Sequence, residues 1–143
     1  MSIDGNYDQG NIFKQILEGR APAVKVYEDA GHLAFMDIFP ESRGHTLVIP
    51  KTEARNYLDL PADAIGDYMK VVQKIAAAVH RALDPAGIRI MQYNGAEATQ
   101  TVFHVHFHIV PCYSGVALTE HAQTAAPVHE LEETAALIRA QLK

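Results

Sequence analysis

From Phe103 to Ile109, apolar residues alternate strictly with histidines. Successive side chains of a β-strand point to opposite faces, so this pattern predicts a strand over Phe103–Val110. The apolar face would pack on the core, while the rings of His104, His106 and His108 would project together from the other face. Strand propensity does not favour histidine, so a solvated face that happens to carry three of them is a weak interpretation.

The other hydrophobic patterns predict four more strands and three helices. Apolar positions recur at helical spacing from Pro61 to Leu83, and Pro61 fits the first turn of this long helix. A short helical turn is expected at Ile12–Leu17, and a terminal helix with one apolar face at Val128–Leu142. Runs of strand-forming residues bounded by turn residues predict Val24–Glu28, His32–Ile38, His45–Ile49 and Gly87–Tyr93. These elements together predict an α+β domain.

Length and composition narrow the class of protein. The 143 residues suit one domain, and 48% hydrophobic with 20% charged residues is typical of a soluble globular protein. A net charge of -5 argues against nucleic-acid binding, which relies on clustered lysines and arginines. We find no secretory signal and no apolar run long enough to span a bilayer, so we expect a cytoplasmic protein without membrane contact. Cys112, the one cysteine, excludes an internal disulfide and is interpreted as an inert small residue.

Zinc binding is one chemical interpretation of the histidine row. Neighbouring histidines on a strand start roughly 6.6 Å apart and the outer two roughly 13 Å apart. Zinc requires nitrogens at about 2.0–2.1 Å, so a pair can converge on one ion but a straight row of three does so poorly. The site would need ligands from elsewhere, such as His45 or Cys112. A metalloenzyme therefore remains the weaker alternative.

Nucleophilic catalysis is the interpretation we favour. A neutral imidazole nitrogen can attack phosphorus and form a phosphoramidate-like intermediate, which water then releases. Because the ordinary pKa of histidine is about 6.5, one ring can be neutral while a neighbour is protonated. The protonated ring would stabilise charge or donate a proton to the leaving group. We expect the row to supply both roles.

The residues around the row resemble the signature of the histidine triad (HIT) family. Its motif, His-φ-His-φ-His-φ-φ with φ apolar, is met at every position from His104 to Val110. The preceding loop, Asn94–Phe103, resembles the family as well. Other similar segments are Asn11–Gly19, Phe35–Ile38 and Gly44–Lys51.

The resemblance covers residues 11–113 and suggests how the chain is divided. Residues 1–10 are expected to form a flexible N-terminus, and residues 114–143 a C-terminal extension that ends in a helix. The resemblance implies the HIT-like fold, with a five-stranded antiparallel sheet, and a homodimer whose sheets join edge to edge.

Four histidines receive catalytic roles from the resemblance. His106 matches the family's nucleophile, and His108 matches a residue that contacts phosphate and the leaving group. His104 takes a supporting part, either through local hydrogen bonds or through contact with substrate. His45 matches a fourth histidine that buttresses the ring array.

The resemblance also implies a nucleotide pocket. Asn94, Gln100 and Thr101 match positions that offer hydrogen-bond donors to phosphate oxygens, and Asp37 matches an acidic residue that binds ribose hydroxyls. Thr99 departs from the family, which commonly has glycine before this glutamine, and a glycine there would suit close approach of the backbone to phosphate. The apolar positions that enclose the base are Ile12, Phe13, Ile16 and Ile38.

A second departure concerns zinc. Many bacterial relatives carry Cys-x-x-Cys around the Ile-Phe pair, and some use it to bind zinc, but here the positions are Asn11 and Lys14. We therefore expect no structural zinc and no other cofactor. The predicted protein is a hydrolase or transferase that cleaves at the α-phosphate of a purine nucleotide-type substrate, either a phosphoramidate or a dinucleoside polyphosphate. A non-catalytic nucleotide-binding homodimer is the alternative.

Overall fold

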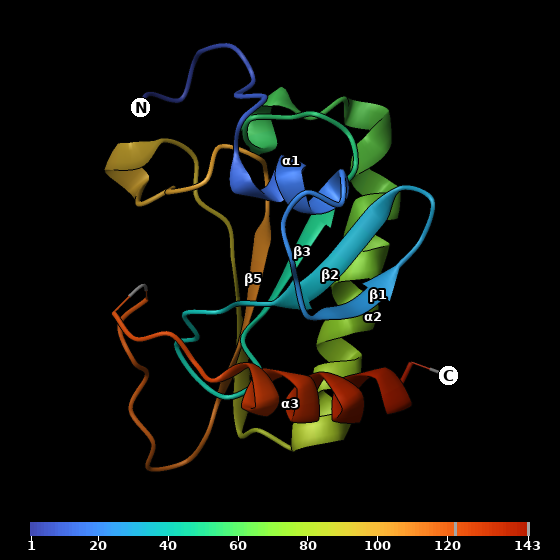
Figure 1. The fold of residues 1–143 in the computed structure, drawn as a ribbon, viewed down its shortest axis with the longest axis vertical. Helices are drawn as coiled ribbons and strands as arrows, with labels where there is room; N and C mark the ends of the chain where they lie inside the picture. The colour runs from blue at the N-terminus through green and yellow to red at the C-terminus, as the bar shows by residue number, and fades with distance from the viewer. Residues whose placement is uncertain (122, 143) are drawn as a thin grey trace.

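The computed structural model describes residues 1–121 and 123–142 and has an α+β architecture (Figure 1). A five-stranded antiparallel sheet, in the order β1-β2-β3-β5-β4, forms its centre. The strands are β1 (Lys25–Glu28), β2 (His32–Met36), β3 (Thr46–Pro50), β4 (Gly87–Met91) and β5 (Phe107–Cys112). The helices are α1 (Ile12–Leu17), α2 (Ile65–Leu83) and α3 (Val128–Ala140). The predicted fold class is therefore confirmed.

The long helix α2 covers one face of the sheet and builds the larger core (Figure 1). Its buried positions, among them Tyr68, Val72, Ile75 and Val79, recur three or four residues apart and so lie on one stripe. The Tyr68 hydroxyl donates to the carbonyl oxygen of Val48 at 2.6 Å, which satisfies the only polar atom of this buried side chain. The helix begins at Ile65, after a 3-10 turn at Ala62–Ala64, rather than at Pro61 as predicted.

The short helix α1 packs on the opposite face, where a second apolar cluster forms. Phe13 and Ile16 of α1 are buried there against Phe35 of β2 and Leu47 of β3. The side chain of Asn11 caps the helix by accepting a hydrogen bond from the backbone N–H of Lys14 at 2.9 Å. This face, and not the α2 face, carries the candidate site.

The strand that carries the histidines begins at Phe107, so the prediction of a strand from Phe103 is wrong for residues 103–106. Phe107 pairs with Val48 of β3, and two residues earlier Val105 would have to pair with Pro50. Proline has no N–H to donate, so the ladder ends there. The N–H of Val105 instead donates to the carbonyl oxygen of Ala54, in the loop after β3, at 2.8 Å.

The side chains still alternate as expected. Val105 and Ile109 are buried in the core beneath α2. His106 and His108 open instead towards α1, together with Phe13. The rings of His106 and His108 lie with their centroids 5.0 Å apart.

The N-terminal segment packs on the domain. The guanidinium of Arg55 donates to the carbonyl oxygens of Ser2 and Asn6 at 2.9 and 3.1 Å, and Ala96 N–H donates to Met1. These contacts lay the N-terminal residues against the loop after β3 and against the loop that precedes the histidines. Mobility of residues 1–10 stays a prediction. Within the described residues, no helix is both long enough and apolar enough to span a membrane.

The stretch between β5 and α3 follows the edge of the candidate site. Its backbone is tethered to the loop after β2, because Thr119 N–H donates to Glu41 at 2.7 Å and Ala126 N–H donates to Ile38 at 2.9 Å. The chain then enters α3, which packs on α2 and β1. We call this segment, residues 113–121 and 123–127, the strap.

Candidate functional site

A cavity of about 420 Å³ lies between α1, the end of β2 and the histidine segment. It brings together eight of the twelve residues that the resemblance had singled out. They are Ile12, Phe13, Ile16, Asp37, Ile38, Thr101, His106 and His108. The cavity is mostly apolar towards α1 and carries its titratable groups at the other end, which is a common arrangement for small-molecule sites.

The surroundings of His106 determine which ring nitrogen can react. Its Nδ1 lies 2.7 Å from the carbonyl oxygen of His104, and a carbonyl accepts only, so Nδ1 carries the proton. The ring stands edge-on to Phe13, with centroids 4.9 Å apart. Burial lowers the pKa of His106 below its ordinary value. His106 is therefore a neutral imidazole whose Nε2 lone pair is available to attack.

A hydrogen-bonded chain determines the tautomer of His108. The backbone N–H of Glu41 donates to Nδ1 of His45 at 3.0 Å, so the proton of a neutral His45 sits on Nε2. That Nε2–H donates to Nδ1 of His108 at 2.9 Å. His108 consequently keeps its own proton on Nε2, where it is a hydrogen-bond donor. Burial lowers the pKa of His45 to about 4 and that of His108 to about 3.

The expectation that a protonated ring stands within the row is wrong for these neighbours. Burial lowers the pKa of His104 to about 4, so it is as neutral as His108 at physiological pH. The physical reason is desolvation, since a charged imidazolium at either of these buried positions would lose its hydration. The row supplies the nucleophile and neutral donors, and not the positive charge.

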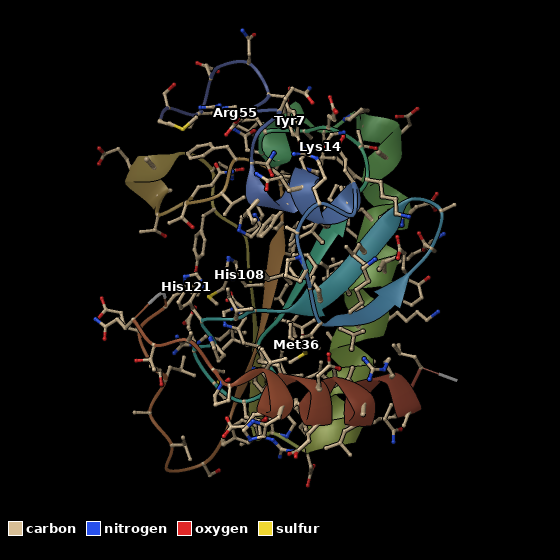
Figure 2. The ribbon with its side chains drawn as sticks, in the orientation of Figure 1. Tyr7, Lys14, Met36, Arg55, His108 and His121 are labelled. Carbon is tan, nitrogen blue, oxygen red and sulfur yellow. The ribbon has the colours of Figure 1, made fainter. Side chains whose placement is uncertain are left out.

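Positive charge is favoured on His121, a residue of the strap that also lines the cavity (Figure 2). Its Nε2 donates to Oδ2 of Asp37 at 2.7 Å, and this hydrogen bond raises the pKa of His121. Oδ1 of Asp37 accepts from the backbone N–H of Phe39 at 2.8 Å. Burial by itself would raise the pKa of Asp37, but the hydrogen bonds from His121 and from the Phe39 N–H, with the imidazole of His45 nearby, hold that pKa below its usual value.

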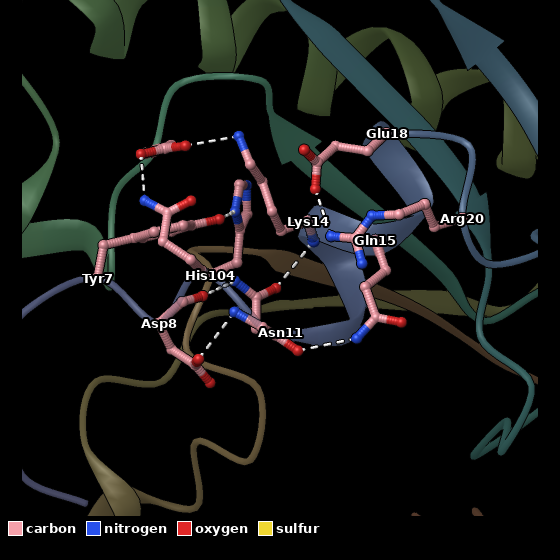
Figure 3. A network of polar contacts seen from close by, with 11 residues as sticks. Tyr7, Asp8, Asn11, Lys14, Gln15, Glu18, Arg20 and His104 are labelled. Atoms are coloured by element: carbon pink, nitrogen blue, oxygen red, sulfur yellow. Dashed lines mark hydrogen bonds and ion pairs between the residues drawn. The ribbon is translucent and has the colours of Figure 1, made fainter.

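His104 lies outside the cavity lining and belongs to a separate polar network (Figure 3). Its Nε2 donates to the carbonyl oxygen of Pro50 at 2.7 Å, which leaves Nδ1 to accept from the hydroxyl of Tyr7. Beside it, Lys14 forms an ion pair with Glu53 at 2.5 Å. Lys14 is one of the two residues on which the prediction of no structural zinc rests. Its ion pair links α1 to the loop after β3, and Glu53 also accepts from the side chain of Gln9 in the N-terminal segment at 2.9 Å.

Two predicted phosphate ligands use their side chains within the loop. The amide nitrogen of Gln100 donates to the carbonyl oxygens of Arg55 and Val102, and its oxygen accepts from Gly95 N–H at 2.8 Å. The oxygen of Asn94 accepts from the N–H of Tyr57 at 2.9 Å. Neither side chain lines the cavity, so both shape the loop and leave Thr101 as the loop residue that faces it.

Thr99 adopts a left-handed backbone, with φ of 70° and ψ of 20°, at the end of the 3-10 turn Ala96–Ala98. This conformation is easy for glycine and costs about 1–2 kcal/mol for residues with a Cβ. A glycine at this position would meet this backbone requirement without strain. Thr99 satisfies the same requirement with strain.

The side chains of Asp37, His45 and His108 place one potential ligand atom each within 4.8 Å of the others. A metal ion needs an unprotonated nitrogen from each histidine. Nε2 of His45 instead carries a proton, because Nδ1 already accepts from the Glu41 backbone. The hydrogen bonding thus favours a histidine pair over a metal centre, and the absence of a metal stays a prediction.

Sequence patterns did not single out His121 or Tyr7. His121 lies in an aperiodic stretch, 84 residues after its partner Asp37, and Tyr7 lies 97 residues before its partner His104. Neither spacing is a recognised motif. The one available signal was a histidine or tyrosine in a segment without a structural reason for it.

The fold and the site define an α+β protein with a cavity built beside a histidine row, and the comparisons with known proteins agree. The HIT domain matches residues 18–115. Adenosine 5'-monophosphoramidase hnt1 of Schizosaccharomyces pombe is 43% identical over 100 residues, which cover 70% of this chain and 72% of that protein. This chain therefore belongs to the HIT family.

Two solved structures give the same result. A Hit-like protein involved in cell-cycle regulation from Bartonella henselae, crystallised with an unknown ligand, has a TM-score of 0.89 and 47% identity, covering 96% of this chain and all of that one. A Zn-bound histidine triad family protein from Mycobacterium smegmatis has a TM-score of 0.82 and 39% identity, covering 94% of each chain.

Proposed function

We propose that this chain cleaves nucleotides at the α-phosphate through a covalent nucleotidyl-His106 intermediate. The observation that carries the proposal is the single hydrogen bond from Nδ1 of His106 to the carbonyl of His104. It leaves the lone pair of Nε2 on a ring that lines a nucleotide-sized cavity. A histidine kept only for structure would not need its second nitrogen in a cavity.

The cavity suggests how the substrate would lie. The base would fit among the apolar side chains of Ile12, Ile16 and Ile38, and the ribose hydroxyls would donate to Asp37. The α-phosphate would then reach His106, with His108 Nε2–H and Thr101 as donors to its oxygens. Neutral donors suit this task, because they bind the phosphate without protonating the attacking nitrogen of the nucleophile.

The proposed reaction has two displacements at phosphorus. Nε2 of His106 forms a bond to phosphorus as the bond from phosphorus to the leaving nitrogen or oxygen breaks, and the leaving group takes up a proton from solvent. Water then attacks phosphorus and gives up a proton to solvent, while the bond from phosphorus to Nε2 breaks, which releases the nucleoside monophosphate and restores His106.

A nucleoside phosphoramidate is the substrate class we propose to test first. The yeast relative is named an adenosine 5'-monophosphoramidase, and the similarity covers about the same share of both chains. Dinucleoside polyphosphates are the competing class. Turnover of adenosine 5'-monophosphoramidate and of diadenosine polyphosphates, measured side by side, distinguishes the two.

His106→Ala tests the covalent step. We expect turnover to fall by about 10³-fold or more, because the nucleophile is lost. Binding of AMP should remain measurable, since Asp37 and the apolar end of the cavity are unchanged. Mass spectrometry of protein quenched during turnover should find a nucleotidyl adduct in wild type and none in the variant. Turnover at the wild-type rate in His106→Ala rules out the nucleophile.

We also propose a homodimer joined through β4. The edge at β1 is covered, because α3 packs on it and Arg139 donates to the carbonyl of Lys25 at 2.6 Å. Strand β4 is the other edge, and Ile90 on it is 50% exposed. Exposed edge strands readily pair with another copy. Light scattering should find twice 15.7 kDa for wild type, and Ile90→Lys should shift the mass towards the monomer.

A further inference from the structure

The strap places a fifth histidine within the site. Nε2 of His121 is 2.7 Å from Oδ2 of Asp37. The ring of His121 lies 5.7 Å from that of His45 and 5.9 Å from that of His108, centroid to centroid. Figure 2 shows His121 and His108 converging from the strap and from β5. His121 thus lies beside both Asp37, which we propose to bind the ribose, and His108, which we propose to bind the phosphate.

The charges around the cavity indicate why a histidine at position 121 matters for binding an anion. Asp37 is the only acidic residue among those that line it, and the described lining contains no lysine or arginine. His106 and His108 are held neutral by burial. A nucleotide phosphate would therefore enter beside an uncompensated carboxylate unless His121 is protonated. Like charges at contact distance in a partly desolvated site disfavour binding strongly.

We propose that His121 is a binding residue of the HIT site, whose imidazolium offsets Asp37 and attracts the phosphate of the nucleotide. This inference rests on the proposed function, because it specifies how the same cavity accepts an anion without a basic side chain. A carboxylate can accept about four hydrogen bonds. Asp37 therefore keeps capacity for the ribose hydroxyls while it holds His121 and the Phe39 N–H.

The groups that face His121 set the sign of its pH dependence. Asp37 and Glu41 are acidic and favour its protonated form, whereas His45 and His108 are neutral in the pH range of interest. His121 carries its charge below its raised pKa and loses it as the pH rises through that value. The contribution to phosphate binding should follow the same course.

Calorimetric binding of AMP and of adenosine to His121→Gln is the central experiment. Glutamine can still donate to Asp37 but carries no charge. We expect AMP to bind about tenfold more weakly at about pH 6, which corresponds to the loss of one charge contact, and adenosine to change less than about twofold. At about pH 9 the difference in AMP affinity between wild type and variant should shrink. Because both proteins are measured at the same pH, the ratio of their dissociation constants is independent of the ionisation of AMP itself.

Two further variants control the experiment. His121→Lys keeps a positive charge at both pH values, so AMP should bind with little pH dependence relative to wild type. His129→Gln removes an exposed histidine of α3 and should change neither ligand. Equal losses for AMP and adenosine in His121→Gln, or no loss for AMP, would overturn the proposal, because a strap that acts only by packing affects both ligands alike.

A ligand-free measurement separates this inference from the proposed function. Titration of the His121 ring by NMR should find a pKa above the ordinary histidine value, and Asp37→Asn should lower it. A wild-type value at or below the ordinary one overturns the role of His121. Wild-type protein that titrates as expected but binds neither AMP nor adenosine overturns the proposed function instead.

Discussion

The two ends of the histidine row lie in different surroundings. At one end, His104 is fully buried, and both its nitrogens are used by Tyr7 and Pro50. At the other end, His108 lines a cavity and keeps its Nε2–H as a donor. The hydrogen-bonded pair Asp37 and His121 lines the same cavity. Repetition of a residue in the sequence therefore does not imply repetition of its role. One end holds the scaffold together and the other faces the ligand.

Acidification should affect both ends and produce the largest effect. His45, His104 and His108 have pKa values of about 4, 4 and 3 in the fold, whereas an unfolded histidine titrates near 6.5. Their stabilising contribution is therefore complete above pH 6.5 and is lost as the pH falls towards 4. We expect the free energy of unfolding to drop by on the order of 3–5 kcal/mol between pH 7 and pH 5.

Urea denaturation at several pH values measures this drop. The exposed His80 provides the control, because His80→Gln should leave the pH dependence unchanged. His121 acts in the opposite direction, since its raised pKa makes its contribution decline as the pH rises. A free energy of unfolding that stays flat from pH 7 to pH 5 would contradict the neutral, buried state of the row.

Substitution at the ligand end should affect turnover more than stability. His108→Gln keeps an oxygen that can accept from His45 but misplaces the donor to phosphate. We expect kcat/KM to fall about a hundredfold, which corresponds to about 2.7 kcal/mol of transition-state stabilisation. Tyr7→Phe is the matched change at the scaffold end, and it should cost about 1 kcal/mol of stability with turnover within about threefold. A larger loss of turnover in Tyr7→Phe than in His108→Gln would reverse the comparison.

The loop between β4 and the row should show the smallest effect. Thr99→Gly relieves a left-handed backbone, but glycine also increases the entropy of the unfolded chain. The net expectation is a gain of about 0.5 kcal/mol in stability with unchanged turnover. Thr52→Gly is a control, because Thr52 is exposed and has no positive φ, so glycine there should destabilise. Thermal denaturation of both variants decides the matter.

Local patterns in the sequence predicted what depends on neighbouring residues. The sequence predicts helix α1 at its observed bounds, because a short apolar turn that ends before Gly19 is a local signal. Helix α3 was placed within two residues for the same reason. The motif and its family resemblance also predicted His106, His108 and Asp37, which the structure brings to one cavity.

Properties that arise from distant contacts were not predictable in this way. The charge state of the row depends on burial, which periodicity does not measure, and so the expected protonated neighbour was wrong. The role of Gln100 inside the loop depends on the backbone of Arg55, 45 residues away. His121 reaches Asp37 only because the strap is tethered to the loop after β2.

Pro50 has a consequence that extends beyond its own strand. Because Pro50 has no N–H to donate to the neighbouring strand, the regular pairing of β3 with β5 ends at Phe107. His108 therefore lies within a strand of the sheet, while His104 and His106 lie on irregular backbone, where the His104 carbonyl accepts a hydrogen bond from the ring of His106. Pro50, which has no reactive group of its own, thus helps to determine why His104, His106 and His108 have different surroundings.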